Sequence, residues 1–160
     1  MPARATRLIA AVALFAALWS AAEAKERHIG YYYPPPLSEE VYTARAQVLS
    51  DSDRKRRLAF VTGLTIQMLS QPYPPQFVVF AKGDEAEKLI IVATQDNAYD
   101  TVYRARALFA MLTAIARQTA FFQDYGVEDL FTFFDLARLL GFEHITISDG
   151  KRFAHRVVLR

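Results

Sequence analysis

Two carboxylates and a guanidinium stand close together where an apolar run gives way to a helical pattern. Asp96 and Asp100 follow the apolar residues 89–93, and Arg104 comes four positions after Asp100. Side chains at such a junction can converge on one ligand, and paired carboxylates can move protons during hydrolysis. The same residues also suit helix capping by Asp96 or Asp100 and an Asp100–Arg104 pair one helical turn apart. The sequence favours capping, and a ligand site at these residues is the alternative.

Two histidines lie in the last apolar segments, on either side of an Asp-Gly pair that favours a turn. A two-residue turn would place His144 opposite His155, where both rings could bind one metal ion. That pairing would also set isoleucines opposite polar residues. A three-residue turn with a bulge at Gly150 pairs Ile147 with Lys151 and gathers the apolar side chains on one face. We therefore predict histidines on opposite faces, no shared metal site, and a partly buried, hydrogen-bonded His155.

The familiar catalytic motifs are absent from the chain. It contains no cysteine and no Gly-x-Ser-x-Gly sequence, and its six glycines are not clustered. The sequence therefore offers no reactive thiol, no nucleophile elbow and no phosphate-binding loop. It predicts no cofactor and favours a protein that is not an enzyme.

Tyrosines and prolines stand together in two stiff segments. Tyr31, Tyr32 and Tyr33 run into three prolines, and Tyr73 lies within the sequence Gln-Pro-Tyr-Pro-Pro. Consecutive prolines hold the backbone close to polyproline II, and aromatic rings on such a segment can dock a partner at low entropic cost. Wrapping and sealing of the domain itself is the role the sequence favours. These four tyrosines are nevertheless the best candidates for binding a protein partner.

The elements that would position these residues include four helices. Ser38 followed by two glutamates predicts a short helix over residues 38–49. A longer helix is predicted from about Arg54 to Leu69, where apolar residues occupy more than one face. Apolar spacings of three and four predict helices over residues 100–122 and 127–140, the second closed by a glycine.

Four short apolar runs predict strands, at residues 77–81, 89–93, 143–148 and 152–159. A turn joins the members of each consecutive pair, so two antiparallel hairpins are expected. With the helices, this pattern predicts a single α+β domain over residues 38–160, with a mainly antiparallel sheet of about four strands and helices packed on it.

The first 24 residues have the pattern of a signal peptide. Two arginines precede an unbroken apolar stretch, residues 8–22, and Ala22 and Ala24 are small residues at the positions that a signal peptidase recognises. We expect Sec-type export, cleavage after Ala24 and a periplasmic or secreted protein. Fifteen apolar residues fall short of the about 20 that span a membrane, so a retained anchor is the less favoured alternative. Residues 25–37 then form an extended arm rich in tyrosine and proline.

The charge balance excludes nucleic acid as a partner. The chain has 19 basic and 17 acidic residues, and 17 and 16 are left when the two arginines and one glutamate of the signal peptide are removed. Such a nearly neutral chain has no basic surface for many phosphates. The one basic run, Arg54 to Arg57, is expected to be a solvated first helical turn balanced by Asp51 and Asp53.

Five segments carry a resemblance to a known family: YYYPPP from Tyr31, EVYTARA from Glu40, FAKG from Phe80, FTFFD from Phe131 and SDGKRFAH from Ser148. On these segments, and over nearly all of the chain after the signal peptide, the sequence resembles a family of small exported proteins from Gram-negative bacteria. Some members are labelled molybdopterin-guanine dinucleotide biosynthesis proteins. The resemblance implies a periplasmic domain, and the label implies service to an exported molybdoenzyme. No catalytic residue is carried over.

The sequence thus supports two main functional hypotheses. The first is a non-enzymatic periplasmic binding or interaction protein that uses the tyrosine and proline segments, with His155 as a further candidate binding residue. The second is a small periplasmic hydrolase built around Asp96, Asp100 and Arg104.

Overall fold

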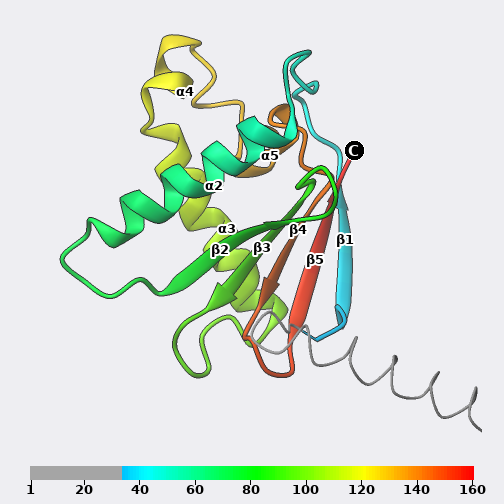
Figure 1. Cartoon of the computed structure of the whole chain (residues 1–160), viewed down its shortest axis with the longest axis vertical. Helices are drawn as coiled ribbons and strands as arrows, with labels where there is room; N and C mark the ends of the chain where they lie inside the picture. The colour runs from blue at the N-terminus through cyan, green and yellow to red at the C-terminus, as the bar shows by residue number, and fades with distance from the viewer. Residues whose placement is uncertain (1–33) are drawn as a thin grey trace, which may run out of the picture. The chain divides into compact units, whose positions relative to one another are not determined.

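A five-stranded mixed sheet is the frame of the structure, a computed structural model that describes residues 34–160 apart from the side chains of residues 120 and 121. The strands are β1 (Ser38–Tyr42), β2 (Phe77–Lys82), β3 (Lys88–Ala93), β4 (His144–Ser148) and β5 (Ala154–Leu159). They lie in the order β1-β5-β4-β3-β2 (Figure 1). The hairpins β2–β3 and β4–β5 are antiparallel, as predicted, whereas β3 runs parallel to β4 and β1 parallel to β5. The sheet therefore has one strand more than predicted and is mixed rather than mainly antiparallel.

The additional strand, β1, replaces the helix predicted over residues 38–49. Its residues alternate between half-buried and exposed, the period-two pattern of a strand with one covered face. Leu37 already joins the sheet, because its N–H donates to the carbonyl of Ala154 at 2.8 Å. The helix prediction was wrong because capping residues are a weak local preference, and pairing with β5 outweighs it.

The longer helices agree with the sequence prediction to different extents. Helix α2 (Arg54–Leu69) has the predicted bounds, and the carboxylate of Asp53 caps it by accepting from the N–H of Arg56 at 2.7 Å. The predicted helix at 100–122 is divided into α3 (Val102–Arg117) and α4 (Ala120–Asp124). The break falls at Thr119, whose hydroxyl donates to the carbonyl of Ala116 and whose own carbonyl accepts from Phe122.

The last helix, α5 (Phe133–Leu139), is half as long as predicted. The prediction of a start at residue 127 relied on acidic residues near that point. A capping box starts the helix instead: Thr132 accepts from the N–H of Asp135, and the carboxylate of Asp135 accepts from the N–H of Thr132. Gly141 follows the helix with φ +82°, the left-handed conformation predicted for it.

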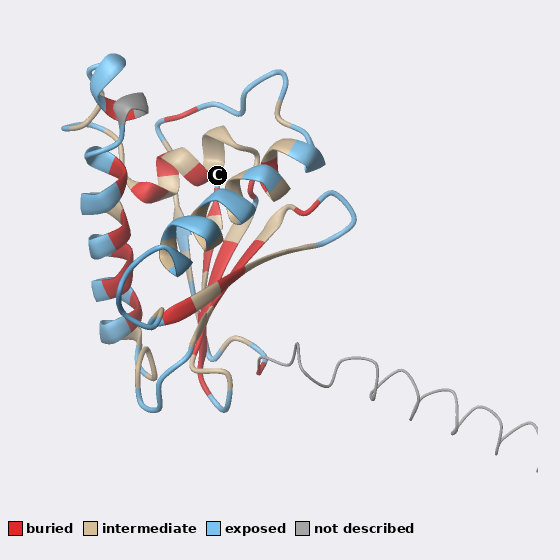
Figure 2. Ribbon diagram, turned by 60° about the vertical axis from the view of Figure 1, so that its left-hand side comes forward, coloured by how far each residue is buried: buried red, intermediate tan, exposed pale blue. Residues whose placement is uncertain are grey.

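The core lies between one face of the sheet and the helices α2, α3 and α5. Figure 2 shows the buried residues of α3 on the side that faces the sheet and its exposed residues on the outer side. In β3, β4 and β5 the core side chains occupy odd-numbered positions, because alternate residues of a strand share a face. The main buried members are Phe77, Val79, Leu89, Ile91, Leu108, Phe109, Leu112, Phe133, Phe142, Ile145, Ile147, Val157 and Leu159.

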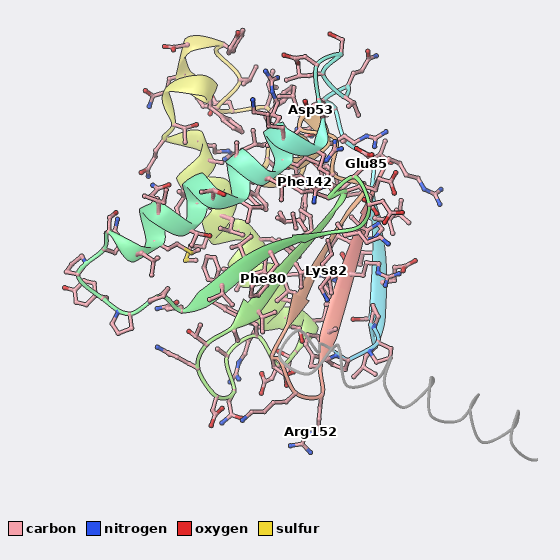
Figure 3. All side chains as sticks on the ribbon, in the orientation of Figure 1. Asp53, Phe80, Lys82, Glu85, Phe142 and Arg152 are labelled. Atoms are coloured by element: carbon pink, nitrogen blue, oxygen red, sulfur yellow. The ribbon has the colours of Figure 1, made fainter. Side chains whose placement is uncertain are left out.

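One arginine of the basic run is not solvated as predicted. The side chain of Arg57 is 7% exposed, and its Nε donates to the carbonyl of Glu85 at 2.8 Å. Its Nη1 donates to Ser52 Oγ at 3.2 Å. Figure 3 shows Asp53, Glu85 and Phe142 at the same upper end of the sheet. The charge is therefore buried against backbone carbonyls, where it joins the start of α2 to the β2–β3 hairpin.

The turn between β4 and β5 is longer than predicted. Ile147 lies opposite His155 and Ser148 opposite Ala154, so five residues, 149–153, form the connection. The predicted pairing of Ile147 with Lys151 is wrong because the carboxylate of Asp149 accepts three backbone N–H groups and organises a wider turn. The register still keeps odd-numbered residues together, so His144 and His155 lie on opposite faces, as predicted.

Within residues 34–160, no helix has both the length and the apolar character that a membrane span requires. The predicted signal peptide, its cleavage after Ala24 and the tyrosines 31–33 of the arm lie outside the described residues.

Candidate functional site

The predicted acidic residues line a polar hollow at the carboxyl ends of β3 and β4. Because these strands are parallel, the loop after β3 and the turn after β4 leave the sheet at the same edge. Figure 3 shows Arg152 on that turn. The hollow has a volume of about 380 Å³ and is lined by Leu37, Asp96, Asn97, Asp100, Asp149, Lys151, Arg152 and Phe153.

Each predicted carboxylate is paired with an exposed cation. Asp100 Oδ1 accepts from Arg104 Nη1 at 2.7 Å, as predicted for a helical pair. Asp96 Oδ1 accepts from Lys151 Nζ at 2.6 Å, and its side chain is 79% exposed. The cap of α3 is Thr101, whose hydroxyl accepts from the N–H of Arg104, and not Asp96 or Asp100. The structure thus brings the three predicted residues together, but it gives them no buried position in which to do acid–base work.

The third carboxylate of the hollow, Asp149, has a structural role. Burial raises its pKa, but three backbone N–H bonds, from residues 151, 152 and 153, together hold the pKa below its usual value. The Oδ1 atom accepts all three at 2.8–2.9 Å. This carboxylate is therefore committed to the turn. Within residues 34–160, no group of three or more histidine, cysteine or acidic side chains is arranged to hold a metal ion.

A second, apolar pocket lies between α2 and α3, above β2 and β3. Its volume is about 330 Å³. It is lined by eight apolar residues and two glutamines: Leu64, Met68, Phe77, Val79, Ile91, Leu112, Ile115, Phe133, Gln67 and Gln71. A smaller hollow of about 140 Å³ lies along β2 and shares Met68, Phe77 and Val79 with it. No charged residue lines the pocket, so it suits an uncharged apolar group.

The pocket exists because α2 packs loosely on the sheet. Arg57 is its only fully buried residue, whereas Phe60, Val61 and Met68 are only partly buried against the core. Helix α3, in contrast, buries a continuous stripe that includes Leu108 and Leu112. Apart from Arg57, the residues of α2 that face the core are thus only partly buried along the whole helix.

A buried polar cluster joins the first and last strands. His155 is 0% exposed, and its Nδ1 lies 2.8 Å from Ser38 Oγ. Its Nε2 lies 3.3 Å from Glu40 Oε1, which also accepts from Arg106 Nε at 2.9 Å and Nη2 at 2.6 Å. The ring of Phe109 lies 6.5 Å from the imidazole. The structure confirms a hydrogen-bonded His155 and buries it more deeply than predicted.

Both described histidines are held neutral by their surroundings. Burial lowers the pKa of His155; the carboxylate of Glu40 opposes this effect and the cation of Arg106 adds to it. Burial also lowers the pKa of His144, with a further contribution from nearby Arg156 and then Lys88. The folded protein therefore takes up protons at these sites at lower pH than the unfolded chain does.

We expect the protein to lose stability as pH falls from about 6.5, the usual histidine pKa, toward the lowered values in the folded state. The sign follows because the unfolded chain binds more protons in this window. The free energy of unfolding, measured by urea titration between pH 5 and 8, should rise with pH. Replacement His155→Gln should flatten the slope more than replacement of the shallower His144. A stability that is constant or rises on acidification to pH 5 would contradict this prediction.

The candidate residues do not form one site. Tyr73 lies on the loop between α2 and β2, is 78% exposed, and lines neither the polar hollow nor the apolar pocket. His155 contacts β1 and α3 rather than the group at Asp96 and Asp100. Sequence reasoning missed Ser38, Glu40 and Arg106 as neighbours of His155. No spacing could have revealed them, since Ser38 and His155 are 117 residues apart.

Comparison with known proteins assigns the chain to no group: no protein-family model matches it, and neither does any curated protein or any solved structure.

Proposed function

We propose that this protein is an exported binding protein whose apolar pocket, between α2 and α3, receives an apolar side chain of a periplasmic protein partner. The observation that carries the proposal is the pocket itself, with about 330 Å³ of space and eight apolar residues in its lining. This volume lies within the range of roughly 300–1,000 Å³ that is usual for ligand sites.

Binding of an apolar side chain in this pocket would remove apolar surface from water and add dispersion contacts with the eight apolar lining residues. The carboxamides of Gln67 and Gln71 can satisfy a peptide group at the rim, because each offers both a donor and an acceptor. An apolar side chain carried on a peptide backbone fits this combination.

Exposed apolar side chains on the same two helices support a protein partner. On α2, Ile66 is 63% and Leu69 67% exposed, and on α3 Ile115 is 43% exposed. Tyr73, just after α2, is 78% exposed. Single exposed apolar residues are ordinary, but Ile115 lines the apolar pocket and Leu69 lines the smaller hollow that shares Met68 with it. Exposed apolar surface that continues from a pocket is typical of an interaction surface.

Export is supported by the signal-peptide pattern of residues 1–24. Recovery of the protein from the periplasm with Lys25 as its first residue would support it; recovery of the uncleaved chain from membranes would favour an anchor. The tyrosines at 31–33 are candidates for a second contact with the partner, which their joint replacement by alanine would weaken.

Replacement Leu64→Tyr should fill the pocket and weaken binding of an apolar probe. We expect N-phenyl-1-naphthylamine, a dye that fluoresces in apolar surroundings, to bind about tenfold less tightly, equivalent to about 1.4 kcal/mol. The matched control is Ile66→Tyr, on the same helix but outside the pocket lining. Loss of dye binding in both variants, or in neither, would contradict the proposal.

Photocrosslinking tests the protein partner directly. A benzoylphenylalanine at position 115, in the pocket lining, should crosslink a partner in intact cells, and Leu64→Tyr should abolish the product. The same group at position 103, 83% exposed on the same helix but outside the pocket, should give no such product. Equal crosslinking from both positions would show that the pocket is not the contact.

The alternative, a hydrolase at Asp96, Asp100 and Arg104, has weaker support. Asp96 and Asp100 border a polar hollow, but Asp100 is paired with Arg104 and Asp96 with Lys151, all of them reached by solvent.

A further inference from the structure

Three polar side chains form a continuous chain across the β1–β5 pair. Ser38 and His155 are direct partners in the parallel register, so their side chains lie on the same face of the sheet. Glu40, two residues along β1, lies on that face as well. The contacts are 2.8 Å from Ser38 Oγ to His155 Nδ1 and 3.3 Å from His155 Nε2 to Glu40 Oε1.

The surroundings of the imidazole decide which nitrogen carries its proton. Nε2 faces the Glu40 carboxylate, which can only accept a hydrogen bond when it is ionised. A lone pair on Nε2 would be repelled there, so the hydrogen belongs on Nε2. Nδ1 is then the acceptor, and the hydroxyl of Ser38 donates to it. This is the arrangement in which a histidine acts as a general base toward a serine.

Arg106 holds Glu40 in place, and burial holds His155 in place. The guanidinium of Arg106 donates twice to Glu40 Oε1, at 2.6 and 2.9 Å, which fixes the position of the carboxylate. His155 is completely buried, which keeps the ring uncharged and its rotamer fixed. The geometry of Nε2 toward Glu40 falls short of a full hydrogen bond. That contact can tighten when the ring gains a proton.

Two members of the group reach the surface, Ser38 and Glu40, whose side chain is 36% exposed. Ser38 is partly exposed, whereas His155 is not. The residue before Ser38, Leu37, lines the polar hollow together with Phe153, which directly precedes the strand that carries His155. Lys151 and Arg152 supply cations in the same hollow. Ser38 therefore lies one residue from the rim of this hollow, and its own side chain is not part of the lining.

We propose that Ser38 is the nucleophile of a Ser38–His155–Glu40 triad that hydrolyses small carboxylic esters. Ser38 Oγ forms a bond to the ester carbonyl carbon while its proton passes to His155 Nδ1. The tetrahedral intermediate collapses, the bond to the alcohol oxygen breaks, and Nδ1 gives the proton to the leaving alcohol. A water molecule then loses a proton to Nδ1 and attacks the acyl carbon. Ser38 regains that proton as the carboxylic acid leaves.

This activity is independent of the apolar pocket, and its test separates the two. A fluorophosphonate reagent should label the mature protein once, at Ser38, as located by peptide mass spectrometry. Ser38→Ala should abolish the label, and Ser70→Ala should not, since Ser70 is an exposed serine whose hydroxyl only donates to the carbonyl of Gln67. Glu40→Gln should slow labelling at least tenfold. Its circular dichroism spectrum should match that of the wild type, which would show that the fold is retained. No labelling, or labelling at another serine, would overturn the proposal.

The absence of cysteine allows a second test that does not depend on the reagent. Ser38→Cys and Ser70→Cys each create the sole thiol of the chain. A histidine acceptor beside position 38 should stabilise the thiolate, so iodoacetamide at pH 6 should alkylate Ser38→Cys at least tenfold faster than Ser70→Cys. Glu40→Gln in the Ser38→Cys background should remove most of the difference. Equal alkylation rates would show that Ser38 and His155 form only a structural hydrogen bond.

Discussion

Replacement of Asp135 by alanine is expected to lower the free energy of unfolding by about 3 kcal/mol and the melting temperature by about 10 °C. The carboxylate is 0% exposed and accepts from the N–H of Arg45 at 2.7 Å, the N–H of Thr132 at 2.8 Å and the hydroxyl of Tyr42 at 3.0 Å. Alanine would leave these donors without their acceptor inside the protein. Burial raises the pKa of Asp135, but the hydrogen bonds from Arg45, Thr132 and Tyr42 together bring the pKa below its usual value, so the charge is stabilised.

Urea titration at pH 7 measures this effect against two further variants. Asp135→Asn keeps one acceptor oxygen and should cost less than the alanine variant. Asp129→Ala removes an exposed carboxylate six residues earlier and should change stability by no more than about 0.5 kcal/mol. If Asp135→Ala were as mild as Asp129→Ala, the hydrogen bonds that Asp135 accepts from Tyr42, Arg45 and Thr132 would not contribute to stability as expected.

Replacement Gly141→Ala should destabilise the protein by about 2–3 kcal/mol, because it combines two costs. Gly141 has φ +82°, which a side chain disfavours, and a Cβ there would lie 2.5 Å from Arg57 Nη1. It would also press on Ser52, whose hydroxyl donates to the carbonyl of Leu140 at 2.5 Å. Because Arg57 is buried and bonded to three segments, it cannot move aside without losing those contacts.

Gly63→Ala provides a control with the opposite sign. Gly63 lies in the middle of α2, and no heavy atom lies within 4 Å of the Cβ that alanine would add. Alanine is favoured over glycine inside a helix by about 1 kcal/mol, so this variant should be more stable than the wild type. Thermal unfolding of both variants distinguishes strain at Gly141 from a general intolerance of substitution. A stabilising Gly141→Ala would contradict the left-handed conformation.

The elements that the sequence predicts correctly are those with strong local signals. α2 is bounded by a capping aspartate and by prolines, and β2, β3, β4 and β5 are dense runs of β-branched and aromatic residues. In each of these cases the local preference agrees with the tertiary environment. The helix predicted at Ser38 failed because β1 is specified by a strand more than a hundred residues away. The early start predicted for α5 is wrong because the capping box between Thr132 and Asp135 starts the helix at Phe133.

The candidate site was predictable only where neighbours in sequence are also neighbours in space. The Asp100–Arg104 pair follows from helical spacing and is present. The neighbours of His155 come from β1 and α3, whose positions depend on the strand order, and that order cannot be read from apolar periodicity. The apolar pocket depends on how loosely α2 packs on the sheet. The spacing of the apolar residues in α2 does not reveal that loose packing.

The pairing of β1 with β5 also sets an order of events during folding. Among the five strands, β1 comes first and β5 last in the sequence, and Ser38 contacts a residue 117 positions further along the chain. Contacts of such long separation form late, because a large loop must close first. Until residues 154–159 have been synthesised, β1 therefore has no β5 strand with which to pair. The sheet closes last at the place where Ser38, Glu40 and His155 assemble, so that cluster forms only in a chain that carries the whole domain.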